Sequence, residues 1–129
     1  MPRVIHFEIQ AEDPGRAIAF YTAVFDWTFQ KWEGPMPYWL IVTGAEGTPG
    51  INGGLLPRHG GRPLEMASVN AYVCTVDVPN LDEYLVRSIA AGGPTVVPKM
   101  PIPGIGWLAY CKDPEGNIFG MMQSDKSAA

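Results

Sequence analysis

The stretch HFEIQAEDPGRAIAFYTAVFDW, residues 6–27, contains a strand pattern followed at once by a helix pattern. In residues 4–10 apolar side chains alternate with the polar His6, Glu8 and Gln10. This alternation has the period of a half-buried strand, so one face packs and the other meets a more polar environment. The chain therefore begins with a strand whose polar face carries His6 and Glu8.

The helix pattern starts after residue 12. Asp13 is suited to the N-cap and Pro14 to the first helical position. Apolar side chains then recur at helical spacing, at Ala17, Phe20, Tyr21, Val24 and Phe25. We expect an amphipathic helix that covers the apolar face of the first strand.

The remaining patterns repeat one unit. Three strand patterns without a helix follow, at residues 27–32, 38–42 and 51–56. A strand, a helix with Asn80 and Glu83 spaced as a capping box, and three more strands come next, over residues 68–76, 80–93, 94–100, 106–111 and 117–123. Agreement in the order of five elements predicts two βαβββ repeats, residues 3–60 and 67–124. A ferredoxin-like βαββαβ sandwich is the alternative, but it has one strand fewer after each helix.

Composition bounds the function. The 129 residues fit one α+β domain, residues 1–129. Nine basic against 13 acidic side chains give a net charge of −4, which argues against nucleic acid or an anionic membrane as a partner. No apolar run approaches the roughly 18 to 20 residues that span a bilayer, and Cys74 and Cys111 form no disulfide framework. We therefore expect a cytoplasmic protein.

The strand faces indicate a binding cleft. Helices cover one side of each unit, so we expect the other side to surround a cleft lined by His6 and Glu8 and, in the second repeat, by Asn70 and Tyr72. A neighbouring carboxylate raises the pKa of a histidine, which would make His6 a general base near neutrality. The alternative is a polar pair that lines the cleft without chemistry.

Aromatic side chains suggest what the cleft holds. Trp39 and Trp107 occupy matching positions in the two repeats, and an aromatic wall binds flat or apolar ligands. Core packing or a dimer interface is the alternative for either tryptophan. Together with Asn52, Asn70 and Tyr72, these tryptophans form the predicted ligand-binding set.

Three stretches carry a resemblance to a known family. They are residues 6–27, quoted above, AAGGPTVVP at residues 90–98 and YCKDPEGNIFGMMQ at residues 110–123. Over residues 3–124 the chain resembles the vicinal oxygen chelate superfamily, which has the glyoxalase, bleomycin-resistance and extradiol-dioxygenase fold. It looks most similar to the group described as predicted enzymes related to lactoylglutathione lyase. The resemblance implies paired βαβββ units, a U-shaped, cup-like mixed sheet with helices on the outer face, and a homodimer.

The same resemblance implies where a metal would bind. Metal-dependent glyoxalases take ligands from the first and last strands of each unit, in the pattern His, Glu, His, Glu. His6 stands at the first of these positions. The others fall at Gly53 or, with a shift of one, Asn52; at Asn70 or Ala71; and at Gly120. We therefore expect no metal cofactor, with His6 the only family ligand position retained.

Three functional hypotheses follow. In the first, a metal-free homodimer binds a small organic ligand, with His6 and Glu8 as acid-base residues. In the second, the chain is a lyase or isomerase of glyoxalase type that uses a divalent ion, with His6 as one ligand. In the third, the chain sequesters an antibiotic or metabolite without turnover, as the bleomycin-resistance branch suggests.

Overall fold

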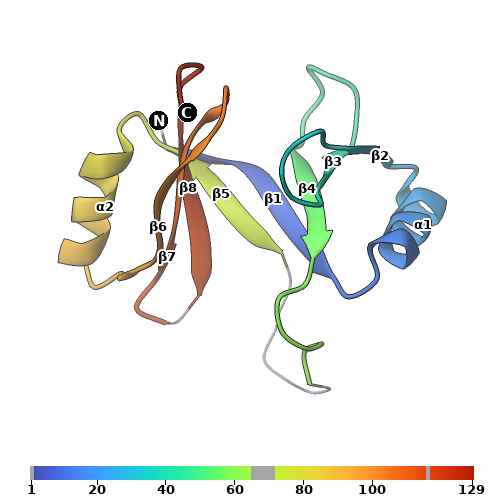
Figure 1. Cartoon of the computed structure of the whole chain (residues 1–129), viewed down its shortest axis with the longest axis horizontal. Coiled ribbons are helices and arrows are strands. Elements are labelled where there is room, and N and C mark those ends of the chain that lie inside the picture. The colour runs from blue at the N-terminus through green and yellow to red at the C-terminus, as the bar shows by residue number, and fades with distance from the viewer. Residues whose placement is uncertain (1, 65–71, 116) are drawn as a thin grey trace. The chain divides into compact units, whose positions relative to one another are not determined.

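The computed structural model describes residues 2–64, 72–115 and 117–129, and its elements follow the predicted order (Figure 1). They are β1 (Arg3–Ala11), α1 (Pro14–Phe25), β2 (Thr28–Lys31), β3 (Trp39–Val42), β4 (Asn52–Pro57), β5 (Val73–Asp77), α2 (Leu81–Ala90), β6 (Thr95–Ile102), β7 (Gly106–Lys112) and β8 (Ile118–Ser124). This order is βαβββ written twice, so the predicted α+β class is confirmed. In the described part of the chain, neither helix has the length and apolar content needed to cross a membrane.

The strands order themselves in the same way within each repeat. The order is β2-β3-β4-β1 in the first repeat and β6-β7-β8-β5 in the second. The first and last strands of a repeat pair in parallel, and the other pairs are antiparallel, which gives the predicted mixed sheet. The chain divides into two compact units: the N-terminal unit, residues 6–72, and the C-terminal unit, residues 1–5 and 73–129.

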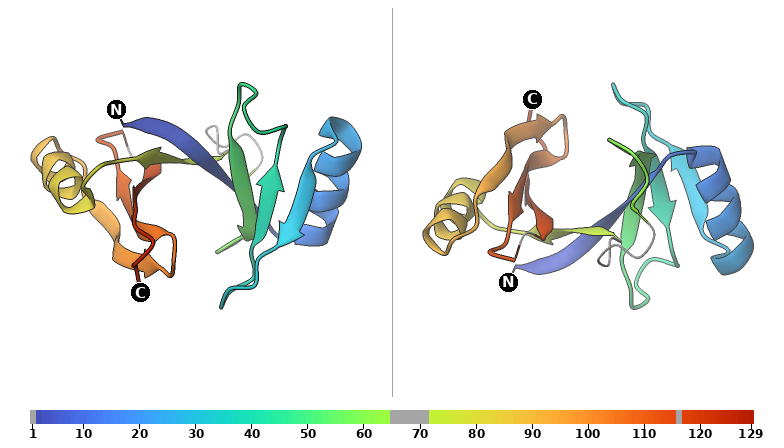
Figure 2. Two further views of the ribbon diagram at one scale, coloured as in Figure 1. Left: turned by 90° about the horizontal axis from the view of Figure 1, so that it is seen from above. Right: turned by 90° about the horizontal axis from the view of Figure 1, so that it is seen from below.

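One core holds α1 against the sheet of the N-terminal unit. Phe7, Ile9 and Ala11 of β1 are buried there, together with Ile41 and Leu55. The helix begins as expected, because the Asp13 side chain accepts a hydrogen bond of 3.1 Å from the backbone N–H of Arg16. Figure 2 shows each helix lying along one side of the strands of its own unit. The opposite side of each sheet carries no helix, and we call it the helix-free face.

The apolar stripe predicted for α1 is only partly correct. Ala17 and Tyr21 pack on the core as expected, but so does Ile18, which was not in the stripe. Three other members are exposed, namely Phe20, Val24 and Phe25. The two phenylalanines contact neighbouring rings instead: Phe20 meets Tyr21 edge to face with ring centroids 5.2 Å apart, and Phe25 lies against Trp27 at 5.1 Å. The helix is thus rotated from the orientation that the stripe predicted.

Strand register decides which side chains share the helix-free face of the N-terminal unit. Glu8 pairs with Gly54 across β1 and β4, and Gly54 pairs with Leu40 across β4 and β3. Because paired residues point to the same side of a sheet, these positions face away from α1. Gly53 pairs with Phe7 and lies on the helix side, contrary to its predicted place in the cleft. One residue of register separates the two glycines and reverses the face.

The C-terminal unit repeats this plan around α2. Leu81, Ala109, Cys111 and Met121 are buried members of its core. The predicted cap of α2 is present, because the Asn80 side chain accepts a 3.0 Å hydrogen bond from the Glu83 backbone. On the helix-free face Gly120 pairs with Thr75 of β5 and with Tyr110 of β7.

Candidate functional site

Three polar side chains meet on the helix-free face of the N-terminal unit. His6 and Glu8 point the same way from β1, and Tyr38 lies immediately before β3. The Tyr38 hydroxyl lies 2.9 Å from Nε2 of His6 and donates a 3.0 Å hydrogen bond to Oε2 of Glu8. The direct distance from His6 Nε2 to Glu8 Oε2 is 3.9 Å. The tyrosine therefore bridges the pair that the sequence predicted.

The segment between β2 and β3 places Tyr38. The backbone N–H of Trp32 donates a 2.8 Å hydrogen bond to the carbonyl of Tyr38, and the two rings meet edge to face with centroids 6.0 Å apart. On β4 the residue opposite Glu8 is Gly54, where a Cβ atom would overlap the Tyr38 hydroxyl. The lack of a side chain at Gly54 therefore makes room for the bridge.

Burial sets the charge of His6. The His6 side chain is 30% exposed and that of Glu8 is 14% exposed. Removal from water lowers the pKa of His6, and this effect exceeds the opposing influence of the Glu8 charge. The prediction that Glu8 would raise the pKa of His6 overall is therefore wrong, because it left burial out. A lowered pKa favours the neutral imidazole near neutrality.

The hydrogen bond from Tyr38 to Glu8 favours one tautomer of that neutral imidazole. Tyr38 donates its proton to the Glu8 carboxylate, so its oxygen accepts a proton from Nε2 of His6. The lone pair of the ring then lies on Nδ1, which becomes the basic atom. The group can thus accept a proton at Nδ1 while the Glu8 charge stabilises the resulting imidazolium through Tyr38.

Asn52 shares a face with His6, its partner across β1 and β4. Its side-chain oxygen accepts a 2.9 Å hydrogen bond from the backbone of Thr43, so it fixes the end of β3. The structure thus brings Asn52 close to the site along the strand. Asn70, also predicted to bind ligand, lies outside the described residues.

The predicted aromatic residues lie elsewhere. Trp39 and Trp107 pack against the hydrophobic cores of their units, on the helix side. The Trp107 indole also donates a 3.1 Å hydrogen bond to Asp125. Tyr72 stacks on Phe7 with ring centroids 5.4 Å apart and likewise faces the helix side. We therefore leave Trp39, Trp107 and Tyr72 out of the candidate site.

The donor set does not fit the metal site that the fold suggests. Register makes Gly54 the counterpart of Gly120, since each lies opposite the first strand of its repeat, at Glu8 and at Thr75. The position two residues before Thr75, which corresponds to His6, is Val73. Over the described ranges, no group of three or more His, Cys, Asp or Glu side chains could hold a metal ion. Three of the four family positions therefore lack a ligand.

Sequence reasoning missed the role of Tyr38 and chose the wrong glycine. Alternation along residues 38–42 was the available signal, because Trp39 and Ile41 face the core and Tyr38 must then face the other way.

Comparison with known proteins agrees with this fold. The family model described as Glyoxalase/Bleomycin resistance protein/Dioxygenase superfamily matches residues 3–121. No curated protein matched the sequence.

Solved structures share the fold at low identity. Methylmalonyl-CoA epimerase from Mycobacterium tuberculosis is 15% identical with a TM-score of 0.65, and the alignment covers 95% of this chain and 87% of that one. A Streptomyces coelicolor methylmalonyl-CoA epimerase in complex with 2-nitronate-propionyl-CoA is 13% identical with a TM-score of 0.63, and the alignment covers 98% of this chain and 97% of that one. A glyoxalase/bleomycin resistance protein/dioxygenase superfamily member from Vibrio splendidus 12B01 is 15% identical with a TM-score of 0.62, and the alignment covers 97% of this chain and 100% of that one. The chain belongs to the glyoxalase, bleomycin-resistance and dioxygenase superfamily.

Proposed function

We propose that the chain binds a small organic molecule over the helix-free face of its N-terminal unit and that His6 exchanges a proton with it. The observation that carries this proposal is the Tyr38 hydroxyl, held between His6 and Glu8. Tyr38 and Glu8 orient the imidazole, and His6 is the residue that touches the ligand. This role extends the acid-base function expected for His6 and Glu8 by adding the tyrosine between them.

The state of His6 supports proton transfer. Burial lowers its pKa, so the imidazole is present near neutrality in the neutral form that can accept a proton. Once Nδ1 has taken a proton, the imidazolium is stabilised by the carboxylate beyond Tyr38. A histidine oriented by a hydrogen-bonded carboxylate is a recurring arrangement in acid-base catalysis.

The surroundings support an organic ligand with an acidic C–H bond. Leu40 and Val42 are 41% and 45% exposed and offer an apolar surface beside the polar group. Two of the structural neighbours are named as epimerases, and epimerisation at a carbon removes and returns one proton. We propose a substrate whose C–H bond lies next to a carbonyl group, because that carbonyl makes the proton removable.

The other hypotheses make different demands. A metal-dependent lyase or isomerase needs at least three converging ligands, and the donors at the family positions do not supply them. Sequestration of a metabolite or antibiotic needs the binding face but no proton transfer. Turnover of the bound molecule therefore separates the proposal from sequestration.

A two-step experiment tests the proposal. Thermal shift is measured with 2-oxo acids, 2-hydroxy acids, acyl-CoA thioesters including methylmalonyl-CoA, and bleomycin. Each compound that stabilises the fold is then incubated with protein in D₂O, and loss of its C–H signal is followed by NMR. We expect at least one compound both to stabilise the fold and to exchange its C–H proton for deuterium.

Histidine variants test whether His6 is the base that removes the proton. His6→Gln should slow the exchange by about 100-fold or more while the thermal shift is kept. His59→Gln, which removes the other histidine, is the matched control and should exchange like the wild type. Stabilisation without exchange in every protein would reject proton transfer and favour sequestration, and no stabilisation by any compound would reject the binding proposal.

Assembly and location stay predictions. The expected homodimer is tested by light scattering of the purified chain, where twice the mass of 14.0 kDa would support it. The expected cytoplasmic location is tested by fractionating cells that express the chain.

A further inference from the structure

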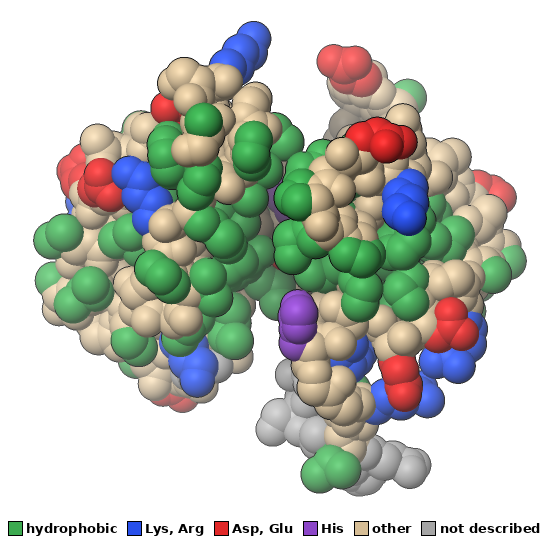
Figure 3. Space-filling view, viewed as in Figure 1, with side chains coloured by type: hydrophobic (Ala, Val, Ile, Leu, Met, Phe, Trp, Pro, Cys, Tyr) green, Lys and Arg blue, Asp and Glu red, His purple; other side chains and the backbone are tan. Residues whose placement is uncertain are grey.

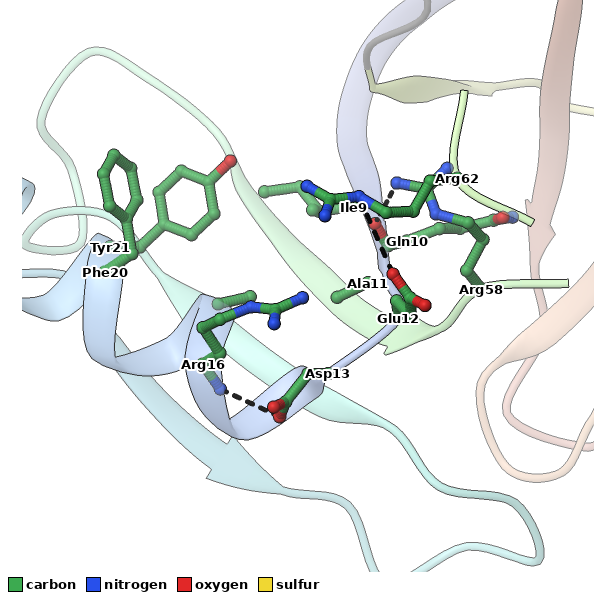
Figure 4. Close-up of a pocket in the computed structure, with 11 residues that line it drawn as sticks. Ile9, Gln10, Ala11, Glu12, Asp13, Arg16, Phe20, Tyr21, Arg58 and Arg62 are labelled. Atoms are coloured by element: carbon green, nitrogen blue, oxygen red, sulfur yellow. Dashed lines mark hydrogen bonds and ion pairs between the residues drawn. The ribbon is translucent and has the colours of Figure 1, made fainter. Parts of the chain in front are cut away.

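A pocket separate from the His6 site opens where β1 ends and α1 begins. Its volume is about 330 Å³, within the range of small-ligand sites of roughly 300 to 1,000 Å³. Its walls come from the last residues of β1, the first turns of α1 and the segment that follows β4 (Figure 4). All of these residues belong to the N-terminal unit.

Arginine side chains dominate the polar lining of this pocket. Arg16 comes from α1, and Arg58 and Arg62 from the segment after β4. Figure 4 shows Arg16 and Arg62 extending into the same space from different sides. Basic and acidic side chains gather at this end of the unit in Figure 3. This is a concentration of cations in a chain whose net charge is −4.

The acidic neighbours already have other partners. Oε2 of Glu12 lies 3.6 Å from Nε of Arg62. The Asp13 carboxylate accepts the Arg16 backbone N–H and so acts as the cap of α1. The pocket therefore has three guanidinium groups against two carboxylates that are held in the protein's own structure.

Arg58 provides the feature that points to a ligand. Its backbone N–H donates to the carbonyl of Ala11 at 2.9 Å, and its Nη2 donates to the carbonyl of Gln10 at 3.0 Å. These bonds hold the side chain at the pocket wall. Its Nε is buried and has no hydrogen-bond partner in the described part of the chain. A buried donor of a charged group without an acceptor is costly, so an oxyanion that reached this donor on binding would relieve that cost.

Most of the uncharged lining is apolar. Ile9 and Ala17 line the pocket, together with the aromatic side chains Phe20 and Tyr21. Phe20 is 56% exposed, so an apolar group of the ligand would cover surface that now meets water. We propose that this pocket binds a small oxyanion, either a carboxylate or a phosphate monoester, that is attached to an apolar group.

NMR of the arginine Nε–H groups tests the proposal. Phenyl phosphate and phenylacetate are titrated separately, with benzyl alcohol as the uncharged probe. We expect one or both anions to shift the Nε–H signal of Arg58, which is identified by its loss in Arg58→Lys, and benzyl alcohol to leave it in place. A response to only one anion assigns the ligand to that class. No response to either anion overturns the proposal.

Variants measure the contribution of the arginines. Arg58→Met should weaken binding of the responding anion by roughly tenfold or more, because it removes a charge-assisted donor. Arg3→Met makes the same change at an exposed position on β1 that does not line the pocket, and should weaken binding less than about twofold because salt screens an exposed charge. Equal losses in Arg58→Met and Arg3→Met would overturn the proposal.

Two further variants keep the test decisive. Should Arg58→Met fail to fold, Arg16→Met takes its place, because the Arg16 side chain is exposed and only its backbone N–H takes part in the Asp13 cap. An unchanged affinity in Arg16→Met would then overturn the proposal. His6→Gln should keep the affinity, and its loss there would place the probe at the His6 site instead.

Discussion

The two βαβββ repeats place a glycine at the same point of their sheets but a different residue opposite it. In the N-terminal unit Gly54 pairs with Glu8 across the parallel first and last strands. In the C-terminal unit Gly120 pairs with Thr75 across the corresponding strands. The same backbone plan therefore supports an ionisable side chain in one repeat and a neutral one in the other.

A tyrosine lies over the glycine in each repeat, and the two tyrosines differ in what they approach. A Cβ on Gly54 would overlap the hydroxyl of Tyr38, whereas a Cβ on Gly120 would lie 3.1 Å from a ring carbon of Tyr110. The first tyrosine thus brings its hydroxyl to the pair of His6 and Glu8, and the second brings its ring to the glycine. Duplication of a fold need not duplicate its chemistry.

The largest expected effect tests whether the two cores are equivalent. Leu55 and Met121 are 0% and 4% exposed and lie in corresponding positions of the two cores. Truncating either to Ala should lower the free energy of unfolding by about 3 kcal/mol, from lost burial and the cavity left behind. Urea unfolding measures both losses. Leu64→Ala is the control, since Leu64 is 83% exposed, and a similar loss in the control would contradict the prediction.

Alanine substitution at the two corresponding glycines should destabilise the two repeats by different amounts. Gly54→Ala forces the Tyr38 hydroxyl to move, and we expect a loss of about 1–3 kcal/mol in the free energy of unfolding. Gly120→Ala brings its Cβ to 3.0 Å from Oγ1 of Thr75, a contact that small shifts can relieve. It should therefore lower the free energy of unfolding by less than Gly54→Ala does. Adding Tyr38→Leu should make Gly54→Ala cheaper. If Tyr38→Leu does not reduce the cost, the contact with the hydroxyl is not its source.

Local patterns predicted the fold well. Alternation along residues 4–10 gave β1, and the caps at Asp13 and Asn80 gave the helix starts, because each depends on neighbours within a few residues. The order of elements then predicted the two repeats. Strand register was harder to predict. Sequence similarity between the repeats matched Gly53 to Gly120, whereas the structural counterpart of Gly120 is Gly54. A shift of one residue turns a side chain to the other face of the sheet.

The candidate site was predicted only in part for a related reason. His6 and Glu8 are two residues apart on one strand, so a single pattern places them together. Tyr38 reaches Glu8 from 30 residues and His6 from 32 residues along the chain, through the turn after Trp32, and no local period encodes these contacts. Trp39 was assigned by analogy with Trp107, while strand alternation places it in the core.

Removing the bridging hydroxyl should have a moderate effect on the N-terminal unit. Tyr38→Phe deprives Glu8 of a donor and His6 of an acceptor, and should lower the free energy of unfolding by about 1 kcal/mol. Urea unfolding measures the loss, and Tyr84→Phe on α2 is the control for deleting a phenol oxygen. The double variant of Tyr38→Phe and His6→Gln should lose less free energy of unfolding than the sum of the losses in the two single variants. Strict additivity would show that the bridge does not couple the residues.

The smallest expected effect is the dependence of stability on pH just below neutrality, which should come from His6 in the N-terminal unit because Val73 stands at the corresponding position of the other unit. Burial lowers the pKa of His6 below its ordinary value of 6.5, so below that pH the unfolded chain binds more protons at this residue than the folded chain. Stability should therefore fall as the pH drops from 6.5 toward the lowered pKa.

Urea unfolding at about pH 7 and about pH 5 measures this loss. His6→Gln should lose less stability over the interval than the wild type, while His59→Gln is the matched control for removing a histidine. A wild-type chain that instead gained stability from His6 on acidification would show that the charge of Glu8 outweighs burial. In that case the imidazole bridged by Tyr38 would be cationic near pH 6.5, and proton donation rather than proton removal would be its first step.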